Sequence, residues 1–195
     1  VCGTRRQHVL LDNARACEAA ARAARSRGFA VGVASDLVEQ HVEAGAAESV
    51  SRLAALYRRE GGGPVCLVSG GEFACPVRGP GVGGRNSETA LRCAFEFEKI
   101  LGRNSGEGGG RRAGLQQPRA VVALCAGTDG ADGNSPAAGA LADHTTLARA
   151  RARGLRPEKF LEESDAHTFF EALGDAVVTG PTGTNVRDVR IMLAK

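Results

Sequence analysis

Apolar and polar positions along the chain follow two periods, one typical of helices and one typical of strands. Apolar residues recur every three to four positions in several alanine-rich segments, which predicts helices. Short runs of Val, Leu, Ala and Ile between them predict buried strands. Helices are expected at Asn13–Arg27, Ala44–Arg59 and Arg85–Leu101, with shorter ones around Ala137–Leu141, Thr145–Arg153, Pro157–Glu162 and Thr168–Leu173. Strands are expected at Phe29–Ala34, Val65–Val68, Phe73–Val77, Ala120–Cys125, Ala176–Thr179 and Val186–Leu193.

Strands that alternate with helices predict an α/β fold. We expect a mainly parallel sheet with helices on both faces, a Rossmann-like layered architecture. In such sheets ligands bind outside the carboxyl ends of the strands. The loops after Val68, Cys125 and Val178 would share that edge if their strands run in one direction. Residues 102–118 are rich in Gly, Arg and Gln, and we expect a flexible insertion there.

Loops rich in glycine and hydroxyl side chains follow three of the expected strands. They lie within Val65–Glu72, Val121–Gly133 and Thr179–Asp188. Glycine lets a backbone approach a ligand closely, and free N–H groups and threonine hydroxyls can donate hydrogen bonds to oxyanions. Three loops of one kind at strand ends predict one composite site for a phosphorylated or carboxylated small molecule.

Charged residues accompany these loops. Asp129 and Asp132 lie three residues apart in a glycine-rich loop. They could bind Mg²⁺ through water, or they could shape Asp-Gly turns, and their spacing leaves both interpretations open. Arg85 begins a helix, where the helix N-terminus and the guanidinium would both favour an anion. The alternative for Arg85 is a surface arginine beside a capping group formed by Ser87 and Glu88.

Several familiar motifs are incomplete. The loop Gly79–Gly84 matches GxGxxG, but the acid that a dinucleotide site needs about 20 residues later falls on Glu107, inside the expected insertion. No Gly-Lys-Ser/Thr sequence occurs, which excludes a Walker A loop. His167 lies just before an expected helix that Asp165 would cap and whose phenylalanines would pack in the core, so a core histidine is favoured over a catalytic base.

Composition narrows the class of protein. The chain has 195 residues and a net charge of +3, which is too small to indicate nucleic-acid binding. It contains no apolar run of the ~20 residues that a membrane helix needs, and no signal peptide is visible. Six cysteines form no CxxC, so we expect core residues in a reducing, cytosolic compartment. Because the chain begins with Val and enters a helix almost at once, we expect a fragment or a processed product.

Five motifs, taken in order, resemble a known family. They are Ser69-Gly70-Gly71-Glu72, Gly83-Gly84-Arg85-Asn86-Ser87-Glu88, the run from Ala126 to Gly133 with Ala137-Ala138-Gly139-Ala140, the segment Asp165–Phe170, and Thr179–Asp188. Together they resemble the C-terminal region of the glycerate 2-kinase family, the MOFRL domain. The resemblance implies a MOFRL-like domain over 63–195. It also implies a preceding α/β segment over 1–62 that forms part of the same domain.

The resemblance implies an activity and a set of partners. The family enzyme uses ATP and Mg²⁺ to phosphorylate glycerate at its 2-hydroxyl, giving 2-phosphoglycerate. It has two α/β domains with the active site between them, and the N-terminal kinase domain with its catalytic lysine is expected to be missing from this chain. Some members have been described as hydroxypyruvate reductases. The implied pathway is serine and glyoxylate metabolism, and the implied compartment is the cytoplasm, with an organelle as the alternative. No membrane or nucleic-acid partner is expected.

The resemblance also assigns roles to residues. Arg85 would meet substrate or phosphate and Asp129 would be the second catalytic residue; the interpretation of Asp129 and Asp132 as metal ligands rests on their spacing. The substrate- and phosphate-binding set would be Ser69, Gly70, Gly71, Glu72, Asn86, Thr128, Thr182, Gly183, Thr184 and Asn185. Three residues depart from the family pattern: Ser87 stands for Gln, Pro136 for an acid and Ser164 for Asn. Two rival functions stay open, a nicotinamide-dependent hydroxypyruvate reductase and a non-catalytic ligand-binding remnant.

Overall fold

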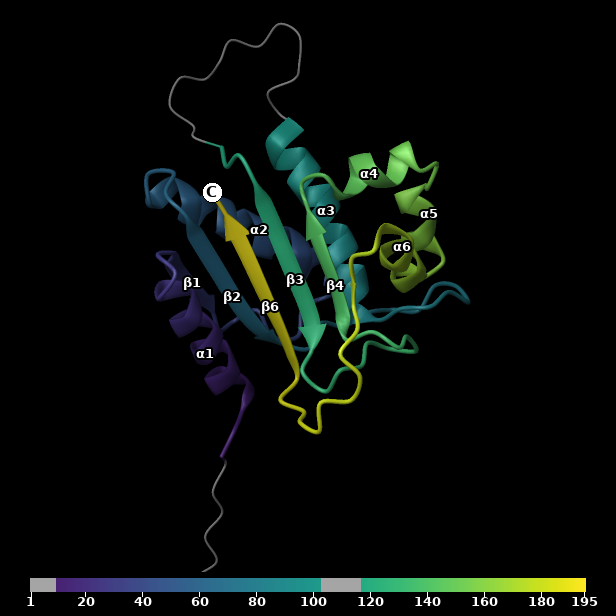
Figure 1. The fold of residues 1–195 in the computed structure, drawn as a ribbon, viewed down its shortest axis with the longest axis horizontal. Coiled ribbons are helices and arrows are strands. Elements are labelled where there is room, and N and C mark those ends of the chain that lie inside the picture. The colour runs from purple at the N-terminus through teal and green to yellow at the C-terminus, as the bar shows by residue number, and fades with distance from the viewer. Residues whose placement is uncertain (1–9, 103–116) are drawn as a thin grey trace, which may run out of the picture.

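The computed structural model describes residues 10–102 and 117–195, and in this part of the chain six strands form one sheet (Figure 1). The helices are α1 (Asn13–Arg25), α2 (Val42–Arg59), α3 (Arg85–Gly102), α4 (Thr146–Ala152), α5 (Pro157–Glu162) and α6 (Ala166–Leu173). The strands are β1 (Ala30–Ala34), β2 (Val65–Gly71), β3 (Val121–Gly127), β4 (Gly139–Asp143), β5 (Ala176–Val177) and β6 (Asp188–Ala194). Most of the expected insertion at 102–118 lies outside the described residues.

The sheet is mixed, and the expectation of a mainly parallel sheet was wrong. Its order is β1-β2-β6-β3-β4-β5, and only β1 and β2 pair in parallel among these strands. The last strand, β6, enters antiparallel between β2 and β3. Because one antiparallel strand separates β2 from β3 and another separates β3 from β5, these three strands still point the same way. Their following loops therefore meet at one edge, the lower edge in Figure 1.

Two of the expected elements were also wrong. The alanine-rich segment Ala137–Leu141 favours a helix by propensity, but its second half belongs to β4, which pairs with β3 and packs under α3. The small residues of β4 fit closely between β3 and α3, so the packing of this segment in the sheet outweighs its intrinsic preference for a helix. Phe73–Val77 forms no strand; its pairing is limited to an isolated bridge between Ala74 and His41.

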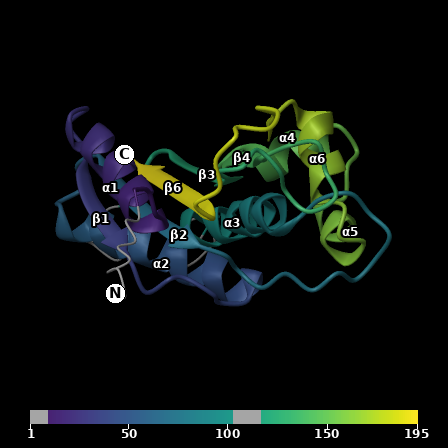
Figure 2. The same ribbon diagram turned by 90° about the horizontal axis from the view of Figure 1, so that it is seen from below.

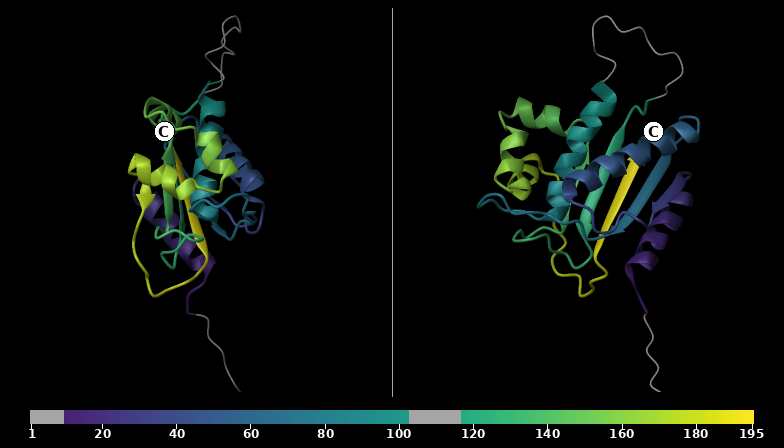
Figure 3. Two further views of the ribbon diagram at one scale, coloured as in Figure 1. Left: turned by 90° about the vertical axis from the view of Figure 1, so that its right-hand side faces the viewer. Right: turned by 180° about the vertical axis from the view of Figure 1, so that it is seen from behind.

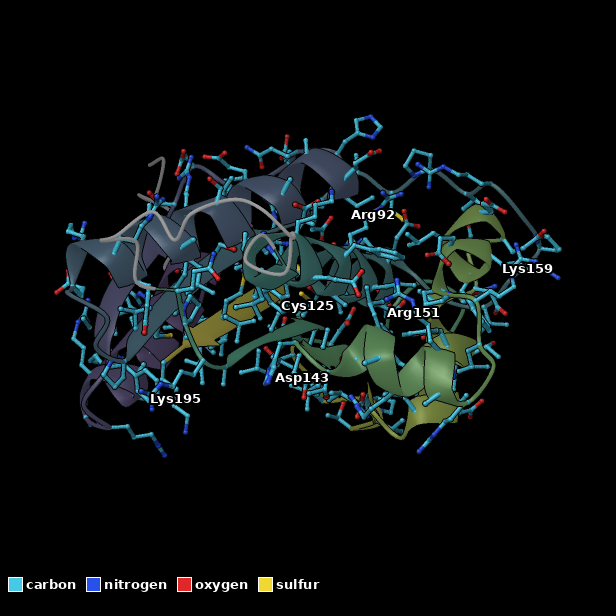
Figure 4. All side chains as sticks on the ribbon, turned by 90° about the horizontal axis from the view of Figure 1, so that it is seen from above. Arg92, Cys125, Asp143, Arg151, Lys159 and Lys195 are labelled. Atoms are coloured by element: carbon cyan, nitrogen blue, oxygen red, sulfur yellow. The ribbon has the colours of Figure 1, made fainter. Side chains whose placement is uncertain are left out.

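Helices cover both faces of the sheet, as expected (Figures 2 and 3). On one face α2 and α3 pack against the strands, and on the other α1 packs on Cys66 and Val68 of β2. Figure 4 shows Cys125 of β3 in the interior beneath α3, whereas Lys159 and Lys195 lie at the periphery. The short helices α4, α5 and α6 pack beside α3 and β4.

The cysteines behave as the sequence predicted. Four of them are buried among apolar side chains, and a fifth, Cys75, is half-buried. These five are free thiols; Cys2 lies outside the described residues. No helix in the described part is both long and apolar enough to cross a membrane.

Candidate active site

A buried carboxylate orients Arg85 at the common edge of the sheet. Arg85 begins α3, and its Nε and Nη2 donate to the two carboxylate oxygens of Asp188 at 2.6 and 3.0 Å. The Asp188 side chain is 1% exposed, whereas that of Arg85 is 36% exposed. Glu72, just after β2, lies 3.4 Å from Arg85 Nη2. Hydrogen bonding to Asp188 raises the pKa of Arg85, so the guanidinium stays charged. We call Arg85, Asp188 and Glu72 the arginine clamp.

Asp188 was not among the site residues expected from the sequence, although the pattern of β6 contains a signal for it. Positions 188, 190, 192 and 194 of β6 alternate onto the face buried under α2 and α3. A charged residue on such a face needs a partner. For Asp188 the partner is Arg85. For Arg190, buried at the next inward position, the partners are Ser69 Oγ, the carbonyl of Leu37 and the ring of Phe73.

The Ser69–Gly71 segment, expected to bind substrate, bonds instead to the chain itself. Ser69 is buried and accepts the hydrogen bond from Arg190. A side chain at Gly70 would overlap Asn13, whose Oδ1 accepts the Gly71 N–H at 2.9 Å. The amide of Asn13 also donates to the carbonyls of Val186 and Asp188. This segment therefore holds the edge together, and only the neighbouring Glu72 reaches the clamp.

The loops after β3 and β5 are joined by hydrogen bonds into one surface. Thr182 donates its N–H to the carbonyl of Asp129 and its hydroxyl to the carbonyl of Thr128. The Asn185 amide donates to Asp129 Oδ2 at 3.2 Å, and Thr128 Oγ1 accepts the Val186 N–H at 2.9 Å. Residues 127–133 and 179–187 together are called the loop platform below. The structure thus brings together four predicted residues, Thr128, Asp129, Thr182 and Asn185.

Part of the loop platform keeps donors available. Within the described residues, the backbone N–H groups of Gly183 and Asn185 donate to no protein acceptor. Gly183 has φ +74°, which a side chain would strain, and the space around its Cα is open. The Thr184 N–H between them donates to Thr182 Oγ1 at 3.3 Å, so the turn leaves two separate backbone donors that an anion could accept. Asn86 differs: it is buried, and its Nδ2 has no partner among the described residues.

Asp132 caps α3 from a distant loop. Its Oδ1 accepts the Asn86 N–H, and its Oδ2 accepts both the N–H and the hydroxyl of Ser87, at 2.7 to 2.8 Å. The first N–H groups of a helix have no partner within the helix, and a carboxylate there also suits the helix dipole. Burial raises the pKa of Asp132, against the effect of these hydrogen bonds. Asp132 therefore fixes the start of α3, and with it Arg85.

We expect Asp132→Asn to destabilise the fold by about 1–3 kcal/mol, because one carboxylate oxygen becomes an NH₂ group that faces the donors of Ser87. Denaturant unfolding of wild type and variant measures this difference. Asp143→Asn is the matched control, since Asp143 is half-exposed, bonds to Thr145 at the start of α4 and lies 3.8 Å from Arg149. An unchanged midpoint in Asp132→Asn would contradict the capping role.

The described residues contain no group of three or more His, Cys, Asp or Glu side chains that could hold a metal ion. Mg²⁺ does not require such a group, because it is commonly held by one or two carboxylates together with substrate phosphates. Asp129 is partly exposed on the loop platform and could supply one carboxylate. The oxygens of Asp132 are already used at α3.

A cavity of about 340 Å³ adjoins the arginine clamp, lined by Arg85, Gly81, Gly84, Cys75 and Glu88 among others. Glu88 is buried between two arginines, 3.0 Å from Arg78 and 2.8 Å from Arg92. The Cys75 thiol lies 3.2 Å from Glu88 Oε2. Burial, with the charge and hydrogen bond of Glu88, raises the pKa of Cys75 to about 12.

Cys75 is therefore expected to resist alkylation although it lines a cavity. At pH 8 it should react with iodoacetamide about 10³-fold more slowly than an ordinary thiol, because only the thiolate reacts. The rate should rise about tenfold per pH unit above pH 8. Mass spectrometry of the Cys75 peptide measures the rate of alkylation. Glu88→Gln should accelerate the alkylation, because it removes the negative charge that raises the pKa of Cys75. Labelling of wild type at the rate of an ordinary thiol would contradict this assignment.

The segment before α6 positions the glycine-rich loop. Asp165 Oδ1 accepts the Val82 N–H at 2.8 Å and the Thr168 hydroxyl at 2.6 Å, so its side chain holds the glycine-rich loop. The expectation that Asp165 caps the backbone of α6 was wrong, because its side chain accepts no N–H group of that helix. His167 is buried, and the two phenylalanines of α6 are fully buried beside it. This agrees with a core histidine.

The fold and the site define a layered α/β domain in which an arginine and several aspartates gather at one edge of the sheet. The chain belongs to the MOFRL family, whose family model matches residues 65–188.

The relatives of this chain are longer proteins. D-glycerate 2-kinase of Thermotoga maritima is 31% identical over 192 residues, covering 95% of this chain and 41% of the relative. A protein of Agrobacterium vitis named putative hydroxypyruvate reductase is 36% identical over 187 residues, covering 91% and 37%. The crystal structure of glycerate kinase from Thermotoga maritima matches with a TM-score of 0.80 and 29% identity, over 96% of this chain and 42% of that one. The chain thus spans about two fifths of their length.

Proposed function

We propose that this chain is the C-terminal domain of a glycerate 2-kinase, which transfers the γ-phosphoryl group of ATP to the 2-hydroxyl of glycerate. The observation that carries the proposal is the arginine clamp beside the loop platform. A guanidinium oriented by a buried carboxylate lies at the same sheet edge as a partly exposed aspartate and open backbone donors. Phosphoryl transfer depends mainly on positioning and charge stabilisation, which these groups can supply.

Within this proposal each group has a distinct role. Arg85 binds the carboxylate of glycerate or a phosphate through the N–H groups that Asp188 leaves available. Asp129 orients the substrate hydroxyl or holds Mg²⁺, which would neutralise phosphate charge when bound. The N–H groups and hydroxyls of Thr182–Asn185 contact phosphate oxygens. Ser69, Gly70, Gly71 and Asp132 support the site from within, because their polar groups bond to the chain itself.

We further propose that the site is completed by an N-terminal kinase domain. Two facts support this: the relatives are more than twice as long as the matched segment, and the loop platform is open to solvent. In this domain division, residues 1–62 and 63–195 form one unit, since β1 pairs with β2 in the same sheet. The free cysteines fit a reducing compartment such as the cytosol.

A nicotinamide-dependent reductase fits this geometry poorly. A dinucleotide pyrophosphate would need the N–H groups at the start of the helix that follows GxGxxG. That helix is α3, and its Asn86 and Ser87 N–H groups already donate to Asp132. The name of the Agrobacterium vitis relative nevertheless makes NADH a necessary arm of the test.

The test is a coupled ADP-release assay on this chain joined to the proposed N-terminal domain. Alternatively, the assay uses a hybrid in which this chain replaces the matching segment of the Thermotoga maritima enzyme. We expect ADP release that depends on glycerate, and no NADH oxidation with hydroxypyruvate. NADH-dependent turnover without ADP release would establish the reductase. Binding of glycerate without any turnover in a folded two-domain protein would establish a non-catalytic remnant.

A further inference from the structure

Arg187 is the one non-glycine residue of the loop platform with a left-handed backbone, at φ +69°. Side chains disfavour this region, and asparagine or glycine would enter it more readily. The conformation is held at both ends of the residue. Its carbonyl accepts the N–H and hydroxyl of Thr128 at 3.1 and 2.7 Å, and its N–H donates to Asn185 Oδ1 at 3.0 Å.

The side chain of Arg187 is not used to support the fold. Within the described residues no hydrogen bond holds its guanidinium. Its ion pair is with Glu39 at 3.9 Å, and the two side chains are 52% and 77% exposed. Such an exposed pair adds little to stability and can yield to a better anion. A strained backbone that presents a guanidinium held only by this long, exposed ion pair is better explained by ligand binding than by folding.

The excess of acids at this edge favours a second arginine for the binding of a phosphate. The clamp and the loop platform, with the nearby Glu39, carry two arginines and five acids: Arg85 and Arg187 against Glu39, Glu72, Asp129, Asp132 and Asp188. Asp188 already occupies two N–H groups of Arg85. Arg187 can offer its fork of donors to a phosphate with more than one negative charge, in addition to any Mg²⁺ that Asp129 would hold.

We propose that Arg187 binds a phosphate group of a substrate or product, as a second guanidinium beside the arginine clamp. This inference rests on the proposed kinase function and extends it. Arg85 is the oriented arginine and Arg187 the adaptable one, which exchanges Glu39 for phosphate. The phosphate could belong to ATP or to 2-phosphoglycerate.

The test measures phosphate recognition and fold stability in one variant. Arg187→Asn removes the guanidinium and places a residue that tolerates positive φ. We expect about a tenfold rise in the KM for ATP or in the inhibition constant of 2-phosphoglycerate, with the KM for glycerate unchanged. The constant that rises identifies the source of the phosphate. The denaturant midpoint should stay at or above that of wild type, because the backbone strain is relieved.

Arg119→Asn is the control, because Arg119 is exposed at the opposite edge of the sheet and its loss changes net charge equally. Unchanged phosphate constants in Arg187→Asn, or equal changes in Arg119→Asn, would overturn the inference while leaving the kinase proposal intact. If wild type shows no turnover, the kinase proposal fails, and the inference is decided by thermal protection with 2-phosphoglycerate or Mg·ATP. Thermal protection that wild type shows and Arg187→Asn lacks would support the inference. Equal protection of the two proteins, or no protection of either, would overturn the inference.

Discussion

Arg85→Ala is expected to lower kcat/KM for glycerate by about 10²–10³-fold in the two-domain protein. The Arg85 guanidinium is oriented by the buried Asp188 carboxylate at the common edge of the sheet, with N–H groups left to face an anion. Removing it deletes a charge-assisted, directed contact that no neighbour can replace. The coupled ADP-release assay over a range of glycerate concentrations measures the loss. Wild-type kcat/KM in this variant would exclude Arg85 from the reaction.

The functional loss has to be separated from a folding defect. Arg85→Ala leaves the buried Asp188 carboxylate unpaired, which we expect to cost about 1–3 kcal/mol because the pair is partly solvated. Arg85→Ala combined with Asp188→Asn removes that charge, so stability should return while activity does not. Arg85→Lys keeps the charge without the fork, and about a tenfold loss is expected.

The order of the strands could not be read from the sequence, although most of the elements could. Val65–Val68 and Ala120–Cys125 are apolar runs between turn signals, and both are strands. Nothing local indicates that β6 pairs with both β2 and β3, because these pairings join residues more than 60 positions apart. Strand direction follows from such non-local pairings, so the pattern of strand and helix suggested a parallel sheet that does not form.

The grouping of the exposed loops at one edge was predictable from the sequence, whereas the buried groups that hold them were not. Glycines and threonines after strands correctly indicated that Thr128, Asp129, Thr182 and Asn185 lie together. The same composition at Ser69–Gly71 serves internal bonds to Asn13 and Arg190. A loop whose donors bind a ligand and a loop whose donors bond to the protein itself can have the same amino-acid composition. The distinction depends on tertiary neighbours.

The two aspartates of the glycine-rich loop illustrate this distinction, and opposite outcomes are expected for them. Asp129 is partly exposed, and among the described residues its carboxylate oxygens accept only the Ala131 N–H and the Asn185 amide. Asp132 is buried and accepts three hydrogen bonds at the start of α3. Their spacing in the sequence made them an equivalent pair of candidate metal ligands. Their environments give them different tasks.

Asp129→Asn is expected to lower kcat by about 10²–10³-fold, while the free energy of unfolding changes by less than about 0.5 kcal/mol. The amide keeps the size and one acceptor but loses the charge that would hold Mg²⁺ or the substrate hydroxyl. ADP release measured across Mg²⁺ concentrations distinguishes the two roles, since only loss of a metal ligand raises the Mg²⁺ requirement. Asp132→Asn is the matched variant, with lower stability and an unchanged Mg²⁺ requirement in the folded fraction. Full activity in Asp129→Asn would show that the loop platform only positions the arginines.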